Sequence, residues 1–135
     1  MISEDKTSEI LNQFLDENIN GIVNVAGVDL IYFLDDNYQI VKEQNITDSP
    51  NYLEQIQNII KSACLNESFG FYLKPFHTCT LLNENGLIII SKLTLSENLY
   101  MVIIAGENEP VDLINLMKTC KEVRVKYEDF LTGGR

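Results

Sequence analysis

The sequence contains two long runs of consecutive apolar and β-branched residues, at positions 86–93 and 99–105. A strand with one face in water alternates apolar with polar residues, whereas these runs are apolar at neighbouring positions. Both faces of the sheet that contains them must therefore be covered. The runs predict two central strands of a sheet that lies between layers of helices.

Three further segments have the pattern of strands beside this central pair. Residues 27–34 are apolar on both faces, and residues 38–44 are shorter and more polar, which is typical of a sheet edge. The Asp-Asp-Asn turn at 35–37 joins them as an antiparallel hairpin. Residues 71–82 alternate, but Pro75 cannot donate to a strand ladder, so this strand is expected at an edge or to bulge. The Asn-Gly pair that ends the next turn favours a tight hairpin into the run at 86–93.

Three segments repeat apolar residues at helical spacing. The first starts near Ser3 and is expected to end between Asn18 and Gly21. The second, residues 51–66, has the widest apolar stripe. The third is expected to begin in the Gly-Glu-Asn-Glu-Pro segment at 106–110, with residues 124–135 as its extension or a tail. Its expected core residues are Leu113, Ile114, Met117, Cys120 and Val123.

Together these segments predict one domain over residues 1–135, of the α/β class and α+β type. The expected order is α-β-β-α-β-β-β-α, with a five-stranded, mainly antiparallel sheet in a three-layer helix, sheet, helix arrangement. The helix at 51–66 should cover one face of the sheet and the terminal helices the other.

Charge and chemistry narrow the function. A net charge of -10 would repel nucleic acid and anionic lipid surfaces. Neither a membrane-spanning run nor a signal peptide is present, so we expect a cytoplasmic protein.

The three cysteines are odd in number and widely spaced, which is typical of reduced core thiols. His77 is the only histidine, and although Cys79 would share its strand face, no third catalytic partner is identifiable. Zinc ligand pairs and phosphate-binding loops are absent, so we expect no enzyme activity, no metal and no cofactor.

Four of the ten basic residues fall close together near the C-terminus. These are Lys118, Lys121, Arg124 and Lys126. They would either complement the negative end of the last helix's dipole or form a docking patch for an acidic partner.

The element order resembles that of the roadblock / dynein light chain family, over residues 8–123. Three local matches carry the resemblance: Ile-Asn-Gly-Ile-Val at 19–23 before Gly-Val-Asp at 27–29, the wide stripe of 52–64, and Asn-Gly followed by Leu-Ile-Ile-Ile at 85–90. The resemblance implies a non-enzymatic adaptor that forms a homodimer and binds a small Ras-like GTPase or a scaffold complex. It also implies a dimer face made by the middle helix and the neighbouring edge strand, namely Tyr52, Ile56, Ile59, Ile60, Ala63, Phe71 and Leu73. Two features depart from the family pattern: residues 35–37 lack the usual hairpin glycine, and Pro75 could interrupt strand pairing between subunits.

A small-ligand sensor of the PAS type is the alternative, because its strands follow a similar order. Such a domain forms its pocket from several short helices between strands two and three. Residues 45–70 leave room for one helix of about four turns. The adaptor is therefore the favoured hypothesis.

Overall fold

The computed structural model describes residues 4–63, 78–93 and 99–133, with the side chains of 4–8 and 63 excepted. Its elements follow the predicted order. They are α1 (Glu4–Val23), β1 (Val28–Leu34), β2 (Ile40–Asn45), α2 (Leu53–Ala63), β3 (Thr78–Asn83), β4 (Gly86–Lys92), β5 (Tyr100–Ala105) and α3 (Leu113–Leu131). None of the helices in these ranges is long and apolar enough to cross a membrane.

The five strands form one sheet in the order β2-β1-β5-β4-β3, and every neighbouring pair is antiparallel. The two short hairpins, β1–β2 and β3–β4, lie at opposite sides of the sheet. The strand β5 lies between the two hairpins and pairs with both β1 and β4. The prediction of edge strands is confirmed for the segment at 38–44 and for the described part of the segment at 71–82, because β2 and β3 are the outer strands. Residues 71–77 lie outside the described residues.

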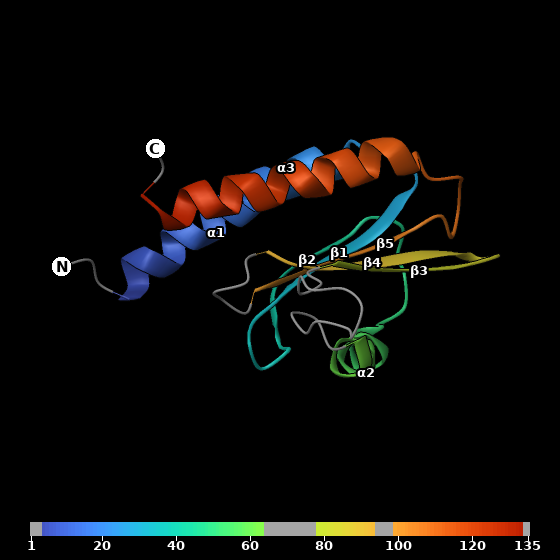
Figure 1. Ribbon diagram of the computed structural model, residues 1–135, viewed down its shortest axis with the longest axis horizontal. Helices are drawn as coiled ribbons and strands as arrows, with labels where there is room; N and C mark the ends of the chain where they lie inside the picture. Colours follow the sequence, from blue (N-terminus) through green and yellow to red (C-terminus); the bar gives the residue numbers. More distant parts are fainter. Residues whose placement is uncertain (1–3, 64–77, 94–98, 134–135) are drawn as a thin grey trace, which may run out of the picture.

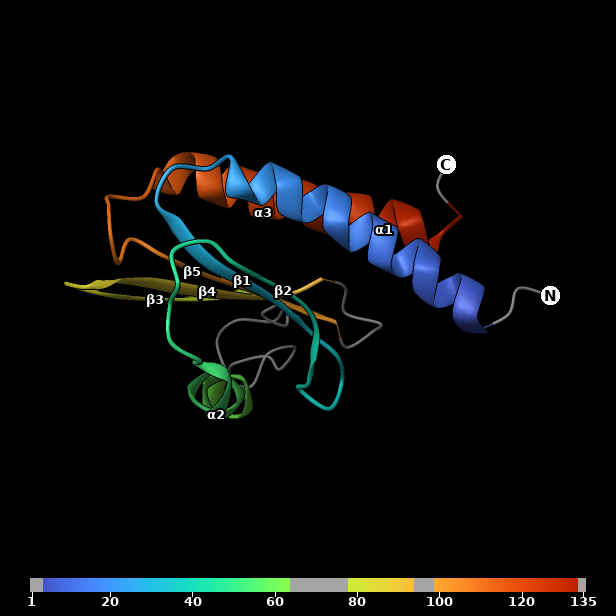
Figure 2. The same cartoon turned by 180° about the vertical axis from the view of Figure 1, so that it is seen from behind.

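Helices cover both faces of the sheet, as predicted. α1 and α3 lie side by side on one face and α2 lies on the other, which Figures 1 and 2 show from opposite sides. Successive residues of β4 alternate between these layers: Ile89 belongs to the core beneath α1 and α3, and Ile90 to the core beneath α2. The consecutive apolar residues of β4 and β5 are thus explained by two separate cores.

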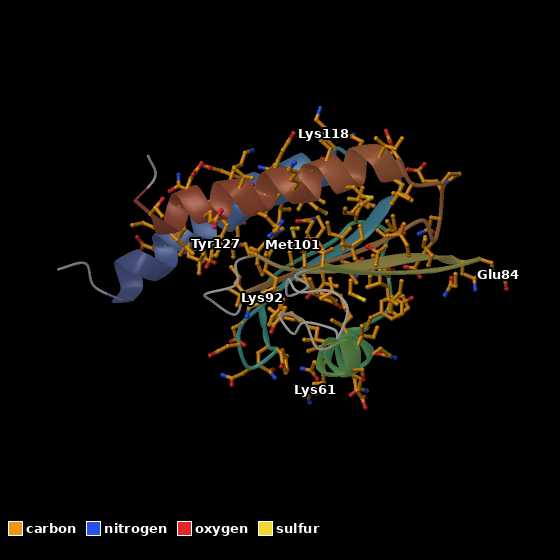
Figure 3. The ribbon with its side chains drawn as sticks, in the orientation of Figure 1. Lys61, Glu84, Lys92, Met101, Lys118 and Tyr127 are labelled. Atoms are coloured by element: carbon orange, nitrogen blue, oxygen red, sulfur yellow. The ribbon has the colours of Figure 1, made fainter. Side chains whose placement is uncertain are left out.

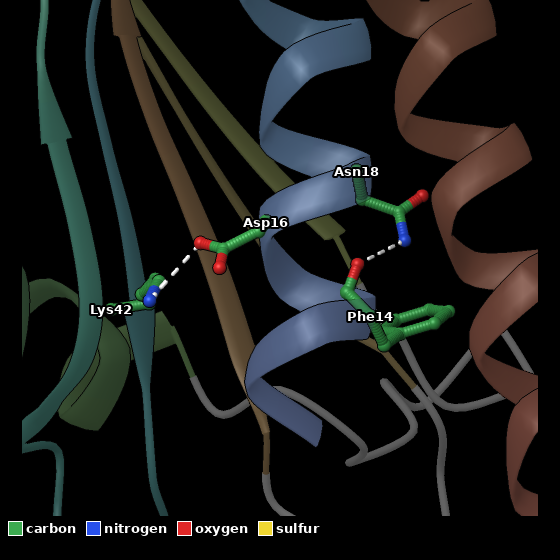
Figure 4. Close-up of polar contacts among 4 residues, drawn as sticks. All are labelled: Phe14, Asp16, Asn18 and Lys42. Carbon is green, nitrogen blue, oxygen red and sulfur yellow. Dashed lines mark hydrogen bonds and ion pairs between the residues drawn. The ribbon is translucent and has the colours of Figure 1, made fainter. Parts of the chain in front are cut away.

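Contacts from side chains fix the helices to the sheet and to each other. Phe14 of α1 packs against Tyr127 and Phe130 of α3, with ring centroids 5.6 and 4.8 Å away. The Asp16 carboxylate on α1 lies 3.0 Å from the ammonium group of Lys42 on β2 (Figure 4). On the other face, the Gln57 amide of α2 donates to the carbonyl of Tyr38 at 2.8 Å.

Two helix boundaries differ from the sequence prediction. α1 continues through Gly21 to Val23, because Ile22 is fully buried and that burial outweighs the conformational cost of a glycine in a helix. α3 starts at Leu113 and not within 106–110, because the Asp112 side chain caps it by accepting from the Asn115 N–H.

The predicted core face of α3 was partly wrong. Cys120 and Val123 are buried, but Ile114 is 84% exposed and Met117 is 56% exposed. Leu116 and Tyr127 take their place in the core, and Figure 3 shows Tyr127 and the β5 residue Met101 in the layer between the helices and the sheet. The buried residues 116, 120, 123 and 127 recur at intervals of three and four, and Ile114 and Met117 are apolar residues that lie beside this row, not in it.

Candidate functional site

The helix α2 presents one face to the sheet and leaves one flank partly open. Its start is fixed because the Asn51 side chain accepts from the Leu53 N–H at 2.9 Å. Ile56 and Ile60, one turn apart, point to the sheet and are 0 and 4% exposed. Tyr52 and Ile59 pack at the margin of the same core and are only partly buried. Because they are two turns apart, they lie on one flank of the helix.

The edge strand β3 supplies apolar residues beside that flank. Leu81 pairs with Ile88 of β4 across the sheet, and directly paired residues point to the same face. Ile88 contacts the core beneath α2, so Leu81 also points to the α2 side. Leu81 remains 45% exposed. We call the surface formed by Tyr52, Ile59, Leu81 and Ile88 the α2–β3 face.

A cavity of about 380 Å³ lies within this surface. Tyr52, Leu81, Ile88 and Ile104 supply its apolar walls, and Glu107 lies at one end. The cavity continues along the tip of the β3–β4 hairpin, which Asn83, Asn85 and Gly86 line. Leu82 pairs with Leu87, which belongs to the core beneath α1 and α3, so its exposed side chain points to the other face of the sheet. A contiguous apolar surface that includes an open sheet edge is typical of a protein-binding site.

A buried carboxylate holds the loops beside the α2–β3 face. The side chain of Asp29, at the start of β1, is buried, and it accepts hydrogen bonds from the Thr47 hydroxyl (2.8 Å), the Asn108 amide (2.8 Å) and the Glu107 N–H (2.9 Å). These bonds join the loop before α2 to the loop after β5. Glu107 in turn accepts from the Tyr52 hydroxyl at 2.7 Å. This hydrogen bond, with partial burial, raises the pKa of Tyr52 above its usual 10.0, so the phenol stays a donor near neutral pH.

The structure places the predicted interface residues in different environments. Ile56 and Ile60 lie inside the chain's own core, so a partner at this face would meet Tyr52 and Ile59 instead. The side chain of Ala63, and Phe71 and Leu73, lie outside the described residues, as do Pro75 and His77.

Sequence reasoning missed Leu81, Ile88 and the Asp29 cluster. The signal for Leu81 was available, because two leucines precede the turn of a strand already expected at an edge. The Asp29 cluster brings together segments far apart in the chain, and no local pattern indicates it.

The described residues offer little for catalysis. They contain no group of three His, Cys, Asp or Glu side chains that could hold a metal ion. Cys120 is buried beneath α3, and burial raises the pKa of its thiol from 9.0 to about 11, so it stays protonated and unreactive at neutral pH. Cys79 pairs with Ile90 and points to the opposite side of the sheet.

Comparisons with known proteins identify the fold. No protein-family model and no curated protein matches the sequence. Among solved structures, a tetrameric arrangement of MglB is similar over 84% of this chain and 83% of its own, with 11% identity and a TM-score of 0.65. A roadblock/LC7 domain from Streptomyces avermitilis matches over 84% and 92%, with 12% identity and a TM-score of 0.59. MglC from Myxococcus xanthus matches over 83% and 98%, with 12% identity and a TM-score of 0.54. The chain therefore has the roadblock/LC7 fold.

Proposed function

We propose that this chain, with its roadblock/LC7 fold, is a non-catalytic adaptor or regulator that forms a homodimer and binds another protein, a small Ras-like GTPase or a scaffold complex. The observation that supports this most is the α2–β3 face. It leaves Leu81 nearly half exposed beside the same cavity as the partly buried Tyr52 and Ile88. Ile59, also partly buried, lies on the flank of α2 that Tyr52 begins. Apolar surface of this kind beside the outer strand of a sheet is stabilised when another chain covers it.

A second copy of the chain fits this face. In a twofold dimer the same residues meet from both subunits, so an apolar surface next to an edge strand is self-complementary. Because β3 is the outer strand of the sheet formed by the described residues, two copies brought together this way would also place their β3 strands near each other. Ile56 and Ile60 would then support the interface from below, through their packing with the sheet.

The choice of a GTPase as partner rests on the family resemblance. The position of the arginine side chain bears on how this chain could change the rate of GTP hydrolysis by such a partner. Arg124, the one arginine among the described residues, lies on α3 and lines the side of the sheet opposite the α2–β3 face. It is poorly placed to act there as an arginine finger. Any change in GTP hydrolysis would then come from repositioning the GTPase's own catalytic groups.

The sensor alternative has less support from the described residues. A ligand-binding sensor needs an internal pocket between its middle segment and the sheet. In this chain Ile56 and Ile60 fill that space by packing on Tyr32, Val102 and the residues around them. The cavity beside α2 is open at the surface and better suited to a protein side chain.

Affinity purification from the native cytoplasm, followed by mass spectrometry, tests the proposal. The bait is the tagged wild type, and the test variant is Ile59→Glu, which places a charge on the α2–β3 face. The matched control is Ile114→Glu, the same change at an exposed position of α3. We expect the wild type and Ile114→Glu to recover a small GTPase or a scaffold protein, and Ile59→Glu to lose it. Recovery of no protein partner, with a small molecule bound inside the purified chain, would overturn the proposal.

A further inference from the structure

A second groove lies on the opposite side of the sheet, between α3 and the strands β3 and β4. Its volume is about 600 Å³. Thr78 and Thr80 of β3 and Ile89 of β4 form one wall, and residues of α3 form the other. Because Thr80 pairs with Ile89, which belongs to the core beneath α1 and α3, this groove and the α2–β3 face are on different faces of the sheet.

The α3 wall combines apolar and basic groups. Met117 is 56% exposed, and the buried Cys120 lies below it. Lys118, Lys121 and Arg124 also line the groove, and among its described lining residues none is acidic. Figure 3 shows that the Lys118 side chain extends away from the sheet. Lys121 and Arg124 follow Met117 by four and seven residues, so they lie on the same side of the helix as this groove residue.

This basic wall stands out in a chain with twenty acidic and ten basic residues. Stabilisation of the helix dipole does not explain it, because α3 continues to Leu131 and its last turn contains no basic residue. Of the two roles expected for these cations, stabilisation of the helix end is therefore the less favoured. Lys118, Lys121 and Arg124 lie in the middle of the helix and line the groove, whereas Lys126 is outside its lining.

One nitrogen of the Arg124 guanidinium is a buried hydrogen-bond donor that lacks an acceptor among the described residues. Its Nε atom is buried and, within the part of the chain that the structure describes, makes no hydrogen bond. Burial lowers the pKa of its guanidinium, an effect that nearby Glu128 partly opposes. A buried donor without an acceptor is destabilising, whereas a carboxylate in the groove would accept from it in a charge-assisted bond.

We propose that this groove binds an acidic peptide segment of a partner protein. Acidic side chains of the peptide contact Lys121 and Arg124, and an apolar side chain packs on Met117 and Ile89. A protein segment is favoured over an anionic membrane or a nucleic acid because the whole chain carries a net charge of -10, which repels extended anionic surfaces. The site is independent of dimer formation through the α2–β3 face.

Selection from a random peptide display library tests this without knowledge of the natural partner. The wild type is the target, and Lys121→Glu is used for counter-selection. We expect the enriched peptides to combine Asp or Glu with an apolar residue. Their affinity, measured by fluorescence anisotropy, should fall about tenfold or more in Lys121→Glu and weaken with added salt.

Two control variants make the outcome specific. Lys126→Glu, the same charge reversal on α3 outside the groove lining, should bind the peptides like the wild type. Ile59→Glu should also bind them, which separates this site from the proposed dimer face. Enriched peptides without acidic residues, or equal binding to Lys121→Glu and the wild type, would overturn the proposal. So would a selection that yields no acidic peptide while the wild type sediments with phosphatidylserine vesicles and Lys121→Glu does not.

Discussion

The Tyr52 hydroxyl donates a hydrogen bond to the Glu107 carboxylate at 2.7 Å, joining the start of α2 to the loop that follows β5. The same tyrosine ring lines the cavity of the α2–β3 face. One residue thus contributes its polar end to the chain's own stability and its ring to the proposed interface. The position of α2 over the sheet, and hence the shape of this face, depends in part on that bond.

Tyr52→Phe should lower the free energy of unfolding by about 1 kcal/mol, because it removes one hydrogen bond to a charged acceptor at a partly exposed site. Urea denaturation at neutral pH measures the change. Glu107→Gln keeps an acceptor and should cost less. If the double variant loses the sum of the two single effects, the two side chains are not coupled.

Asp29→Ala should be more damaging, with a loss of about 2 to 3 kcal/mol, because it removes a buried carboxylate that accepts from the Thr47 hydroxyl, the Glu107 N–H and the Asn108 amide. Asp16→Ala is the matched control, since it removes the carboxylate of an exposed ion pair with Lys42. That control should lose less than about 1 kcal/mol. Equal losses in the two variants would mean that Asp29 does not hold the loops together.

Neighbouring residues of α3 should respond very differently to truncation. Leu116 is fully buried, so Leu116→Ala should cost about 2 to 5 kcal/mol. Met117 is 56% exposed, and Met117→Ala should cost less than about 1 kcal/mol. Thermal or chemical unfolding of both variants checks the helix register. A larger loss in Met117→Ala than in Leu116→Ala would instead place Met117 in the core, as expected from the sequence.

Burial of Cys120 predicts a loss of stability at high pH. Its thiol pKa is raised from 9.0 to about 11, so between these values the folded state holds a proton that the unfolded state has released. Stability should therefore fall as pH rises through this window, by at most about 1.4 kcal/mol per pH unit from this group. Urea unfolding of the wild type and Cys120→Ala across the window measures it. The variant should show a shallower fall, and identical slopes would contradict the assignment.

Local patterns were sufficient for most of the fold. The unbroken apolar residues at 86–93 and 99–105 predicted a sheet covered on both faces. Consecutive residues of a strand point to opposite faces, so apolar residues at consecutive positions indicate that both faces are buried. The Asp-Asp-Asn and Asn-Gly turns predicted the antiparallel hairpins. The pairing of β1 with β5 is not visible in this way, since it joins segments about 70 residues apart.

The candidate site was less predictable, because exposure depends on tertiary packing. The stripe of α2 identified apolar residues, but only the structure separates Ile56 and Ile60, which pack on the sheet, from Tyr52 and Ile59, which remain partly open. The basic residues of α3 were identified, but their groove requires β3 and α3 to lie together. The Asp29 cluster likewise depends on the start of β1 meeting the loop before α2 and the loop after β5.

The mass of the protein in solution, measured by light scattering at micromolar concentration, tests the proposed dimer most directly. The wild type should have twice the 15.4 kDa mass of one chain. Ile59→Glu should shift to the mass of one chain, because the charge would be buried against apolar residues of the second copy. Ile114→Glu, on the exposed side of α3, should remain at twice that mass. A wild type of 15.4 kDa, or an Ile59→Glu variant that stays at twice that value, would contradict a dimer formed through the α2–β3 face.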